Sequence, residues 1–201
     1  MKSVEDSIIK RVRRRGRGAV FTPFDFLSVG SRDSVDQGLS RLARKQVLRR
    51  VDRGIYSYPK TSALIGELSP DPQKVAEALA RRDAATLLPS GAMAANLLGL
   101  SDQVPSQVVY LTSGPPRTAK VKKLTVTLRP TVAKNLATAK RVTGVVIQAL
   151  RYLGKDQVDS EVVEKLRKRL SVDQRLQLLK DIPYAPAWMA PIFKKIAEGA
   201  V

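Results

Sequence analysis

Long basic side chains alternate with small hydroxyl and amide side chains between residues 31 and 53, a mixture suited to reading nucleic acid. Arginine can make two hydrogen bonds to guanine, and glutamine can make two to adenine. Arg32, Gln37 and Arg41 are therefore predicted to contact bases. Ser34 is a further polar residue of the same segment that can bond to a base edge.

A second group is predicted to bind phosphates rather than bases. Ser31 precedes a predicted helix, where free N–H groups favour an anion. Arginines follow at the end of that helix and in the next segment, and others lie near the N-terminus. The predicted phosphate contacts are Arg44, Arg49, Arg50, Arg53, Arg14, Arg15 and Arg17, with Arg11 and Arg13 in the same run. The alternative for the run at 11–17 is a solvated helix face.

Two absent residue types restrict the chemistry. The chain has no cysteine and no histidine, which excludes disulfides, zinc–thiolate sites, Cys nucleophiles, Ser-His-Asp triads and His-ligated metals. The segment Gly114–Arg117 lacks the spacing of a phosphate-binding loop. The strand predicted at 124–128 carries no carboxylate, and the other acidic residues are scattered. We predict a protein that is not an enzyme, with no catalytic residue, metal or cofactor.

The charge balance indicates a polyanionic partner. The chain of 201 residues has 36 Lys and Arg against 18 Asp and Glu, a net charge of +18. Residues 1–60 hold 15 Lys and Arg and 6 Asp and Glu, so half of the excess lies in under a third of the chain. Such a balance is typical of nucleic-acid-binding proteins. No stretch has the ~18–20 apolar residues of a membrane span, and the N-terminus lacks the apolar segment of a secretory signal, so we expect a cytoplasmic protein without a membrane partner.

The elements that position the basic residues follow from local signals. Ser3 and Asp6 predict a helix start, and Val4, Ile8 and Val12 continue it at helical spacing. Thr22–Pro23 predicts a second, short helix and Ser31 a third one ending near residue 45. Two β-rich runs around the turn at 52–54 predict a hairpin. Helix, short helix, turn, helix and hairpin is the order of a winged helix-turn-helix, in which the third helix enters the major groove. The same shape also serves in protein–protein modules.

A cluster of prolines near residues 59–72 predicts a boundary, giving domains at 1–60 and 61–201. The second domain is predicted as α+β, with a small mixed sheet and several C-terminal helices. Helices are expected from Asp71–Pro72 onward, from a Ser90 cap, and from Ser171, whose spacing to Gln174 is that of a capping box. The remaining predictions are strands at 107–112 and 124–128, and helices at 141–153, 160–170 and after Pro186.

Two further basic groups occur in the second domain. One lies in a predicted hairpin loop (Arg117, Lys120, Lys122, Lys123) and the other on a predicted helix (Lys165, Arg167, Lys168, Arg169). Each is more often a solvated face than a site. Together they could form another surface for an acidic partner.

Several segments resemble antitoxins of the abortive-infection type IV toxin–antitoxin systems (AbiEi-like). They are Gly18–Pro23, Val35–Leu42, Leu48–Tyr56, Leu88–Ala92, Leu97–Leu100 and Val109–Gly114, with Leu48–Tyr56 the most specific. The resemblance implies a winged-helix autorepressor that binds double-stranded DNA at inverted repeats in its own promoter. It also implies a C-terminal domain that counters a nucleotidyltransferase-like toxin in phage defence, without requiring a stable complex with that toxin.

Two other classes of function stay open. The first is a protein whose basic surfaces bind RNA or sequester a toxin directly. The second is a nuclease-related enzyme, and the absence of a carboxylate pair on the predicted strand argues against it.

Overall fold

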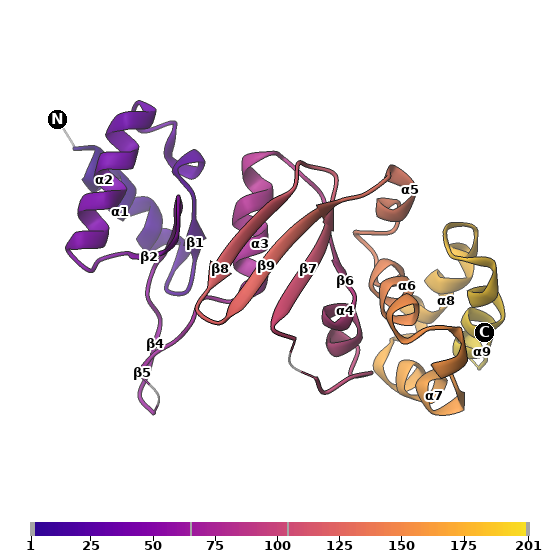
Figure 1. Ribbon diagram of the computed structural model, residues 1–201. Helices are drawn as coiled ribbons and strands as arrows, with labels where there is room; N and C mark the ends of the chain where they lie inside the picture. The colour runs from indigo at the N-terminus through magenta and orange to yellow at the C-terminus, as the bar shows by residue number, and fades with distance from the viewer. Residues whose placement is uncertain (1–2, 65, 104, 200–201) are drawn as a thin grey trace. The chain divides into compact units, whose positions relative to one another are not determined.

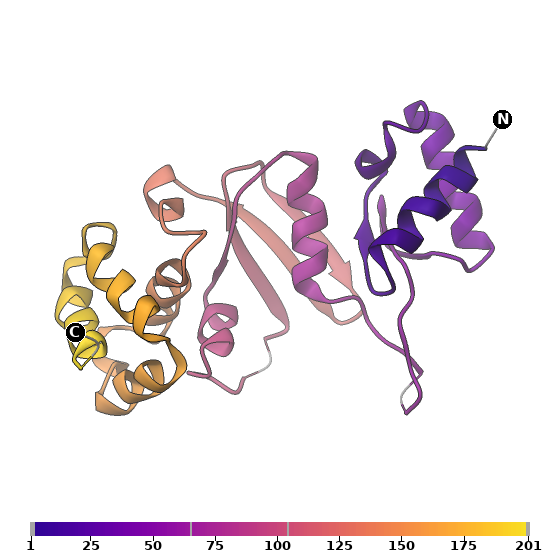
Figure 2. The same cartoon turned by 180° about the vertical axis from the view of Figure 1, so that it is seen from behind.

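The computed structural model describes residues 3–64, 66–103 and 105–199 (Figures 1 and 2). The chain is α+β, as the sequence predicts. Its residues form two compact units: unit 1 is Met1–Ala85 with Arg117–Thr127, and unit 2 is Thr86–Pro116 with Leu128–Val201. Residues 61–85 and 117–127 thus group with the N-terminal residues, whereas the predicted domain ranges separate them at residue 60.

Unit 1 begins with two helices that lie side by side in both views of the fold (Figures 1 and 2). Helix α1 (Val4–Arg15) starts at the predicted capping box of Ser3 and Asp6, and α2 (Arg32–Arg44) starts at Ser31. Gly38 allows their close approach, because a Cβ there would lie 3.1 Å from the Cδ1 atom of Ile8. Between them, the segment predicted as a short helix is a 3₁₀ turn, η1 (Pro23–Phe26).

A three-stranded antiparallel sheet completes the N-terminal part of this unit. Strands β1 (Val20–Phe21), β2 (Arg49–Asp52) and β3 (Ile55–Ser57) are ordered β1–β3–β2, with the predicted hairpin formed by β2 and β3. Gly54 in the connecting turn has φ +69°, a left-handed conformation that favours glycine. The core under the helices and sheet consists of Ile8, Val12, Phe21, Phe26, Val35, Leu39, Leu42, Leu48 and Tyr56.

The rest of unit 1 comes from two separate stretches of chain. The first holds a small hairpin of β4 (Thr61–Ser62) and β5 (Gly66–Glu67), followed by α3 (Pro72–Arg82), which begins at the predicted Asp71 cap. The second is β8 (Arg117–Val121), in the segment predicted as a basic loop. That prediction is wrong for Arg117 and Lys120, because Ala119 and Val121 are buried while Thr118 and Lys120 are exposed, the alternation of a strand. Lys122 and Lys123 do lie in the turn that follows.

The larger sheet has the order β6–β7–β9–β8, formed with β6 (Leu87–Ser90), β7 (Gln107–Thr112) and β9 (Leu124–Pro130). Strands β6 and β7 are antiparallel. The N–H of Thr131, just after β9, donates to the carbonyl of Thr112 at the end of β7 (3.0 Å). These two neighbours therefore end together and run in the same direction, which makes the sheet mixed, as expected.

Unit 2 is otherwise helical. Its helices and turns are α4 (Ala92–Leu97), α5 (Ala133–Leu136), α6 (Val142–Leu153), η2 (Lys155–Gln157), α7 (Ser160–Arg169), α8 (Val172–Lys180), η3 (Ile182–Tyr184), η4 (Ala187–Met189) and α9 (Ala190–Ala197). A core of buried residues from α4 and α6–α9 includes Leu150, Leu166, Leu178 and Phe193. The Ser171 capping box is confirmed. The prediction that Ser90 caps a helix is wrong. Ser90 is the last residue of β6 and pairs with Val109 of β7, and Gly91, at φ +59°, is the residue that precedes α4.

Candidate nucleic-acid interface

Helix α2 presents one row of polar side chains to solvent. Its buried residues are Val35, Gly38, Leu39 and Leu42, which occupy one side of the helix. Asp33, Gln37 and Arg44 are exposed and lie on the opposite side, at spacings of four and seven residues. Neither Gln37 nor Arg44 makes a hydrogen bond or ion pair with any residue that the structure describes. The middle of the exposed face is therefore available to a ligand.

Arg32 and Arg41, the other predicted base contacts, lie on the flanks of this row. Arg32 Nε donates to Asp36 Oδ2 (2.7 Å), one turn along the same helix. Arg41 Nη1 donates to Glu5 Oε1 on α1 (3.3 Å). Both arginine side chains remain about half exposed, at 49% and 59%. Ion pairs of this kind contribute only about 0.2–1 kcal/mol, so either arginine can exchange its partner for a phosphate or a base.

The Glu5 carboxylate accepts hydrogen bonds from two basic side chains at the C-terminal end of α2. Lys45 Nζ donates to its other carboxylate oxygen (2.9 Å), and Lys45 and Arg41 together hold the pKa of Glu5 below its ordinary value, with the hydrogen bond from Lys45 as the largest cause. This carboxylate stays ionised at neutral pH. It links the N-terminal end of α1 to the C-terminal end of α2.

Ser31 and Ser34 use their hydroxyl groups to begin α2. Ser31 Oγ accepts from the Ser34 N–H (3.3 Å), and Ser34 Oγ donates to the Ser31 carbonyl (2.8 Å). The two hydroxyls also bond to each other at 3.1 Å. The structure therefore assigns both predicted site residues a capping role before any ligand binds.

The β2–β3 hairpin carries three of the predicted phosphate contacts, and the structure separates them. Arg49 Nη1 donates to Glu67 Oε1 on β5 (2.7 Å), which holds the β4–β5 hairpin against β2. Arg50 and Arg53 are exposed, and neither side chain has a partner among the described residues. Asp52, in the same turn, accepts from the backbone N–H of Lys120 on β8 (2.7 Å). The hairpin is thus held at Asp52 and leaves Arg50 and Arg53 free.

The arginines of α1 and of the turn that follows it divide in the same way. Arg11 donates to the Asp25 carbonyl (2.6 Å), and Arg15 donates to the Asp25 carboxylate (3.2 Å). Arg17 donates to the Pro59 carbonyl (3.1 Å) and lies over the ring of Tyr58. Arg14 is exposed and bonds to none of the described residues. Of the predicted contacts at 14, 15 and 17, only Arg14 is uncommitted.

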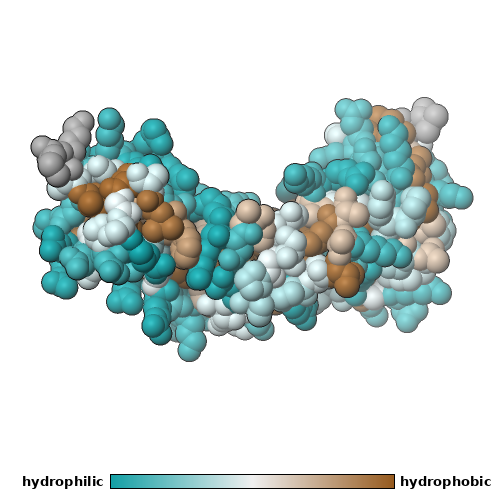
Figure 3. Space-filling view, turned by 90° about the horizontal axis from the view of Figure 1, so that it is seen from above, coloured by the Kyte–Doolittle hydropathy of each residue, from teal (hydrophilic) through white to brown (hydrophobic). Residues whose placement is uncertain are grey.

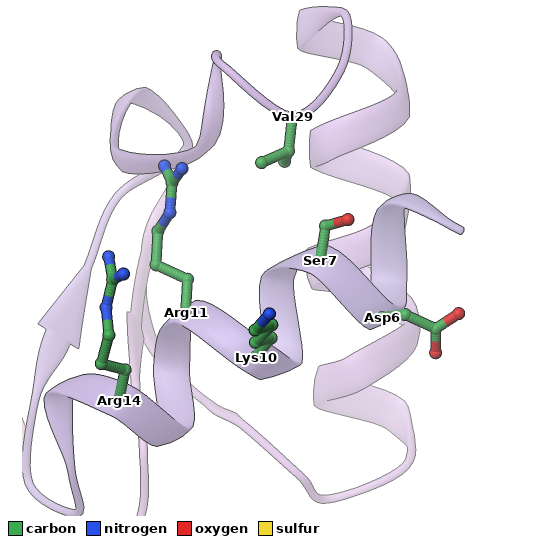
Figure 4. Close-up of a pocket in the computed structure, with 6 residues that line it drawn as sticks. All are labelled: Asp6, Ser7, Lys10, Arg11, Arg14 and Val29. Atoms are coloured by element: carbon green, nitrogen blue, oxygen red, sulfur yellow. The ribbon is translucent and has the colours of Figure 1, made fainter. Parts of the chain in front are cut away.

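A cavity of about 760 Å³ opens beside this helix (Figure 4). Figure 4 shows Arg11 and Arg14 extending from α1 toward the turn that carries Val29 on the other side. Asp6, Ser7 and Lys10 complete the lining. Hydrophobic residues interrupt the hydrophilic surface of this unit when it is seen from above (Figure 3). The cavity itself combines three cations, Lys10, Arg11 and Arg14, with the apolar side chain of Val29.

Asp25 organises the basic residues, and local sequence signals do not reveal this role. Its side chain is only 5% exposed and accepts from Arg15 of α1, from Arg81 of α3 and from the Thr22 N–H (2.7 Å). Arg81 also donates to the Val20 carbonyl (2.8 Å). One carboxylate thus connects α1, η1 and α3. The acidic residue at the third position of the Thr22 capping box was the only signal available, and it predicts the cap alone.

The described residues contain no group of three or more acidic, histidine or cysteine side chains that could hold a metal ion. Among the same residues, no helix has the length and apolar character needed to cross a membrane.

Comparison with known proteins places the chain in a family but assigns it no activity. No curated protein matches the sequence. The crystal structure of the RV2827C protein from Mycobacterium tuberculosis is similar to this chain, with 15% sequence identity and a TM-score of 0.43. That match covers 98% of this chain and 77% of the other. A family model matches residues 7–178, and the chain belongs to this family, described as a family of unknown function (DUF6088).

Proposed function

We propose that this protein is a DNA-binding transcriptional autorepressor and that residues 4–57 are a winged helix-turn-helix. The order α1, η1, α2 and the β2–β3 hairpin supports this proposal. In such a module the second long helix lies in the major groove and the hairpin contacts the sugar–phosphate backbone. The sheet order β1–β3–β2 leaves β2 as the outer strand of the hairpin, where Arg50 is exposed.

The observation that carries the proposal is the set of uncommitted polar side chains on these two elements. Gln37 and Arg44 lie in one row on α2, and Arg50 and Arg53 lie on the hairpin. Like charges left without counter-ions repel one another in the free protein, and a polyanion relieves that repulsion. Gln37 would read a base edge and the three arginines would bind phosphates, while Arg32 and Arg41 exchange their surface partners on binding.

We further propose that the repressor is the antitoxin of a type IV abortive-infection system that counters a nucleotidyltransferase-like toxin. The resemblance of segments in both halves of the chain supports this role. Repression rests on the surface of unit 1 described above. Neutralisation is assigned to the C-terminal part, and no residue there is singled out for it.

The test is a gel-shift titration of the full chain on its own upstream promoter and on a scrambled duplex, at increasing salt. Arg44→Ala is compared with Arg169→Ala, because each arginine is exposed and is the last residue of a helix. Both variants lose one charge and one favourable interaction with a helix C-terminus. We expect Arg44→Ala to weaken binding about tenfold and to lower the salt slope by about 0.9, and Arg169→Ala to do neither.

Three outcomes would contradict the proposal. Equal, weak binding of the native protein to both duplexes would leave only a general polyanion binder. A preference for transfer RNA over duplex DNA would favour the RNA-binding alternative. Co-elution of the toxin in gel filtration, without promoter binding, would favour direct sequestration.

A further inference from the structure

Phe24, on η1, has two guanidinium groups over its ring, and they come from different helices. The Cζ atom of Arg32, the first residue of α2, lies 5.1 Å from the ring centroid. The Cζ atom of Arg82, the last residue of α3, lies 4.5 Å from it. An aromatic face attracts a guanidinium and holds it flat while its N–H groups remain available to other acceptors. Two cations from distant parts of the sequence are thus fixed next to each other.

The position of Arg82 is set by its neighbour Arg81. Arg81 Nε donates to Asp25 Oδ1 (3.0 Å), and Asp25 follows Phe24 directly in η1. Arg81 also bonds to the Val20 carbonyl, so the end of α3 is held against η1 at two points. Arg81 therefore has a structural role. Both arginines are exposed, and Arg82 is the one that makes no hydrogen bond or ion pair with the described residues.

Three carboxylates beside this pair, those of Asp36, Asp83 and Asp25, already accept hydrogen bonds from arginines. Asp36 accepts from Arg32 Nε, which leaves both Nη atoms of Arg32 without a partner among the described residues. Both oxygens of Asp83 accept from Arg117, at 2.8 and 2.9 Å. Asp25 is bonded to Arg15, Arg81 and the Thr22 N–H. Arg82 makes no hydrogen bond or ion pair with any described residue, so its five N–H donors are free.

We propose that Arg82 and Arg32, which both contact the ring of Phe24, form a phosphate-binding point that extends the DNA interface from α2 onto α3. The two Cζ atoms lie no more than about 10 Å apart, since both are close to the same ring, and the rise along one DNA strand is about 3.4 Å per nucleotide. Two arginines this close can both reach phosphates of one strand. The contact strengthens binding without reading sequence. The inference rests on the proposed DNA binding and adds a residue outside the predicted module at 1–60.

The test compares Arg82→Ala with Arg169→Ala on promoter and scrambled duplexes over a range of salt. Both arginines end a helix and have exposed side chains that make no hydrogen bond or ion pair with the described residues. We expect Arg82→Ala to weaken binding to both duplexes by the same factor, about 3- to 10-fold, and to lower the salt slope by about 0.9. Arg169→Ala should match the native protein. Arg82→Lys, which keeps the charge, should restore the slope.

A second variant tests the aromatic contact. Phe24→Leu keeps an apolar side chain and removes the ring, and it should weaken binding to both duplexes. The midpoint of urea unfolding of this variant measures any loss of stability. If Arg82→Ala and Arg169→Ala bind alike while Arg44→Ala is impaired, the extension onto α3 is wrong and the proposed DNA binding stands. If the native protein binds no duplex, the proposed function itself is wrong.

Discussion

At the scale of single residues, the arginines with a structural role are those whose acidic partner is buried. Arginines with an exposed partner, or with none among the described residues, are available to a ligand. Arg15 and Arg81 both contact Asp25, whose side chain is 5% exposed, so they belong to the framework of unit 1. Arg32 pairs with Asp36, whose side chain is 45% exposed, so water or a ligand can readily replace Asp36 as the partner of Arg32. Arg44, Arg50, Arg53 and Arg82 have no such partner among the described residues. The same residue type thus has two roles within one unit.

Asp25→Asn should destabilise the protein by about 2 kcal/mol, because it removes a buried charge that pairs two arginines while preserving an oxygen for the Thr22 N–H. The matched control is Asp36→Asn, which also removes a carboxylate paired to arginine. Since that pair is exposed, its loss should cost no more than about 0.5 kcal/mol. Urea unfolding of both variants measures the difference. Equal losses would contradict the assigned framework role of Asp25.

At the scale of elements, β8 is fixed to α3 and to the β2–β3 hairpin by two acidic side chains. Asp83 directly follows α3, and its carboxylate accepts hydrogen bonds from Nε and Nη2 of Arg117, the first residue of β8. Asp52, on β2, accepts from the Lys120 N–H. These contacts explain why a strand from the middle of the chain belongs to unit 1, and why the hairpin is held at its turn.

Asp83→Asn should lower the stability by about 1 kcal/mol at neutral pH. The hydrogen bonds from Arg117 hold the pKa of Asp83 below its ordinary value of 3.8 and raise the pKa of Arg117. A carboxylate with a lowered folded-state pKa stabilises the protein fully above the ordinary value. That stabilisation is lost as the pH falls from 3.8 through the lower value.

The check is urea unfolding of native protein and Asp83→Asn between pH 7 and the acid range. The difference between them should stay constant down to about one unit above 3.8 and shrink only below it. A difference that disappears near pH 6, or grows as the pH falls, would contradict the pairing.

At the scale of the whole molecule, the charge decides what the protein can bind. A net charge of +18 favours association with any polyanion, so affinity alone cannot identify the partner. Sequence preference and salt slope separate the contributions. In the proposed complex, base contacts from α2 would give the preference, and phosphate contacts from the hairpin and from Arg82 would give the slope.

We expect DNA footprinting on the promoter to protect two half-sites of an inverted repeat, bound cooperatively. Their centres should lie about 34 Å apart, or a multiple of it, so that two copies meet the same side of the duplex. A scrambled promoter of equal length is the control. Protection of a single half-site would contradict the inverted-repeat prediction.

The local structure of this protein could be predicted from its sequence because short-range signals determine it. The Ser3 and Ser171 capping boxes, the Asp71–Pro72 start and the apolar spacing of α2 and α6 all involve residues within two turns of each other. Strands β6 and β8 were missed because each is short and lies beside prolines or lysines. Their hydrogen-bond partners, β7 and β9, are strands that the sequence does predict, but no local pattern shows which segments pair with them.

The candidate site follows the same division. Local pattern alone shows which segment is basic and which face of α2 is polar, since helical periodicity places Gln37 and Arg44 opposite the buried residues. Which arginines lack a partner among the described residues depends on the packing of the folded chain. Arg15 and Arg81 meet at Asp25 from positions 66 residues apart in the sequence, and Arg82 reaches Phe24 across a similar separation. Charge and periodicity are properties of neighbouring residues, whereas the choice of an ion-pair partner depends on packing between distant ones.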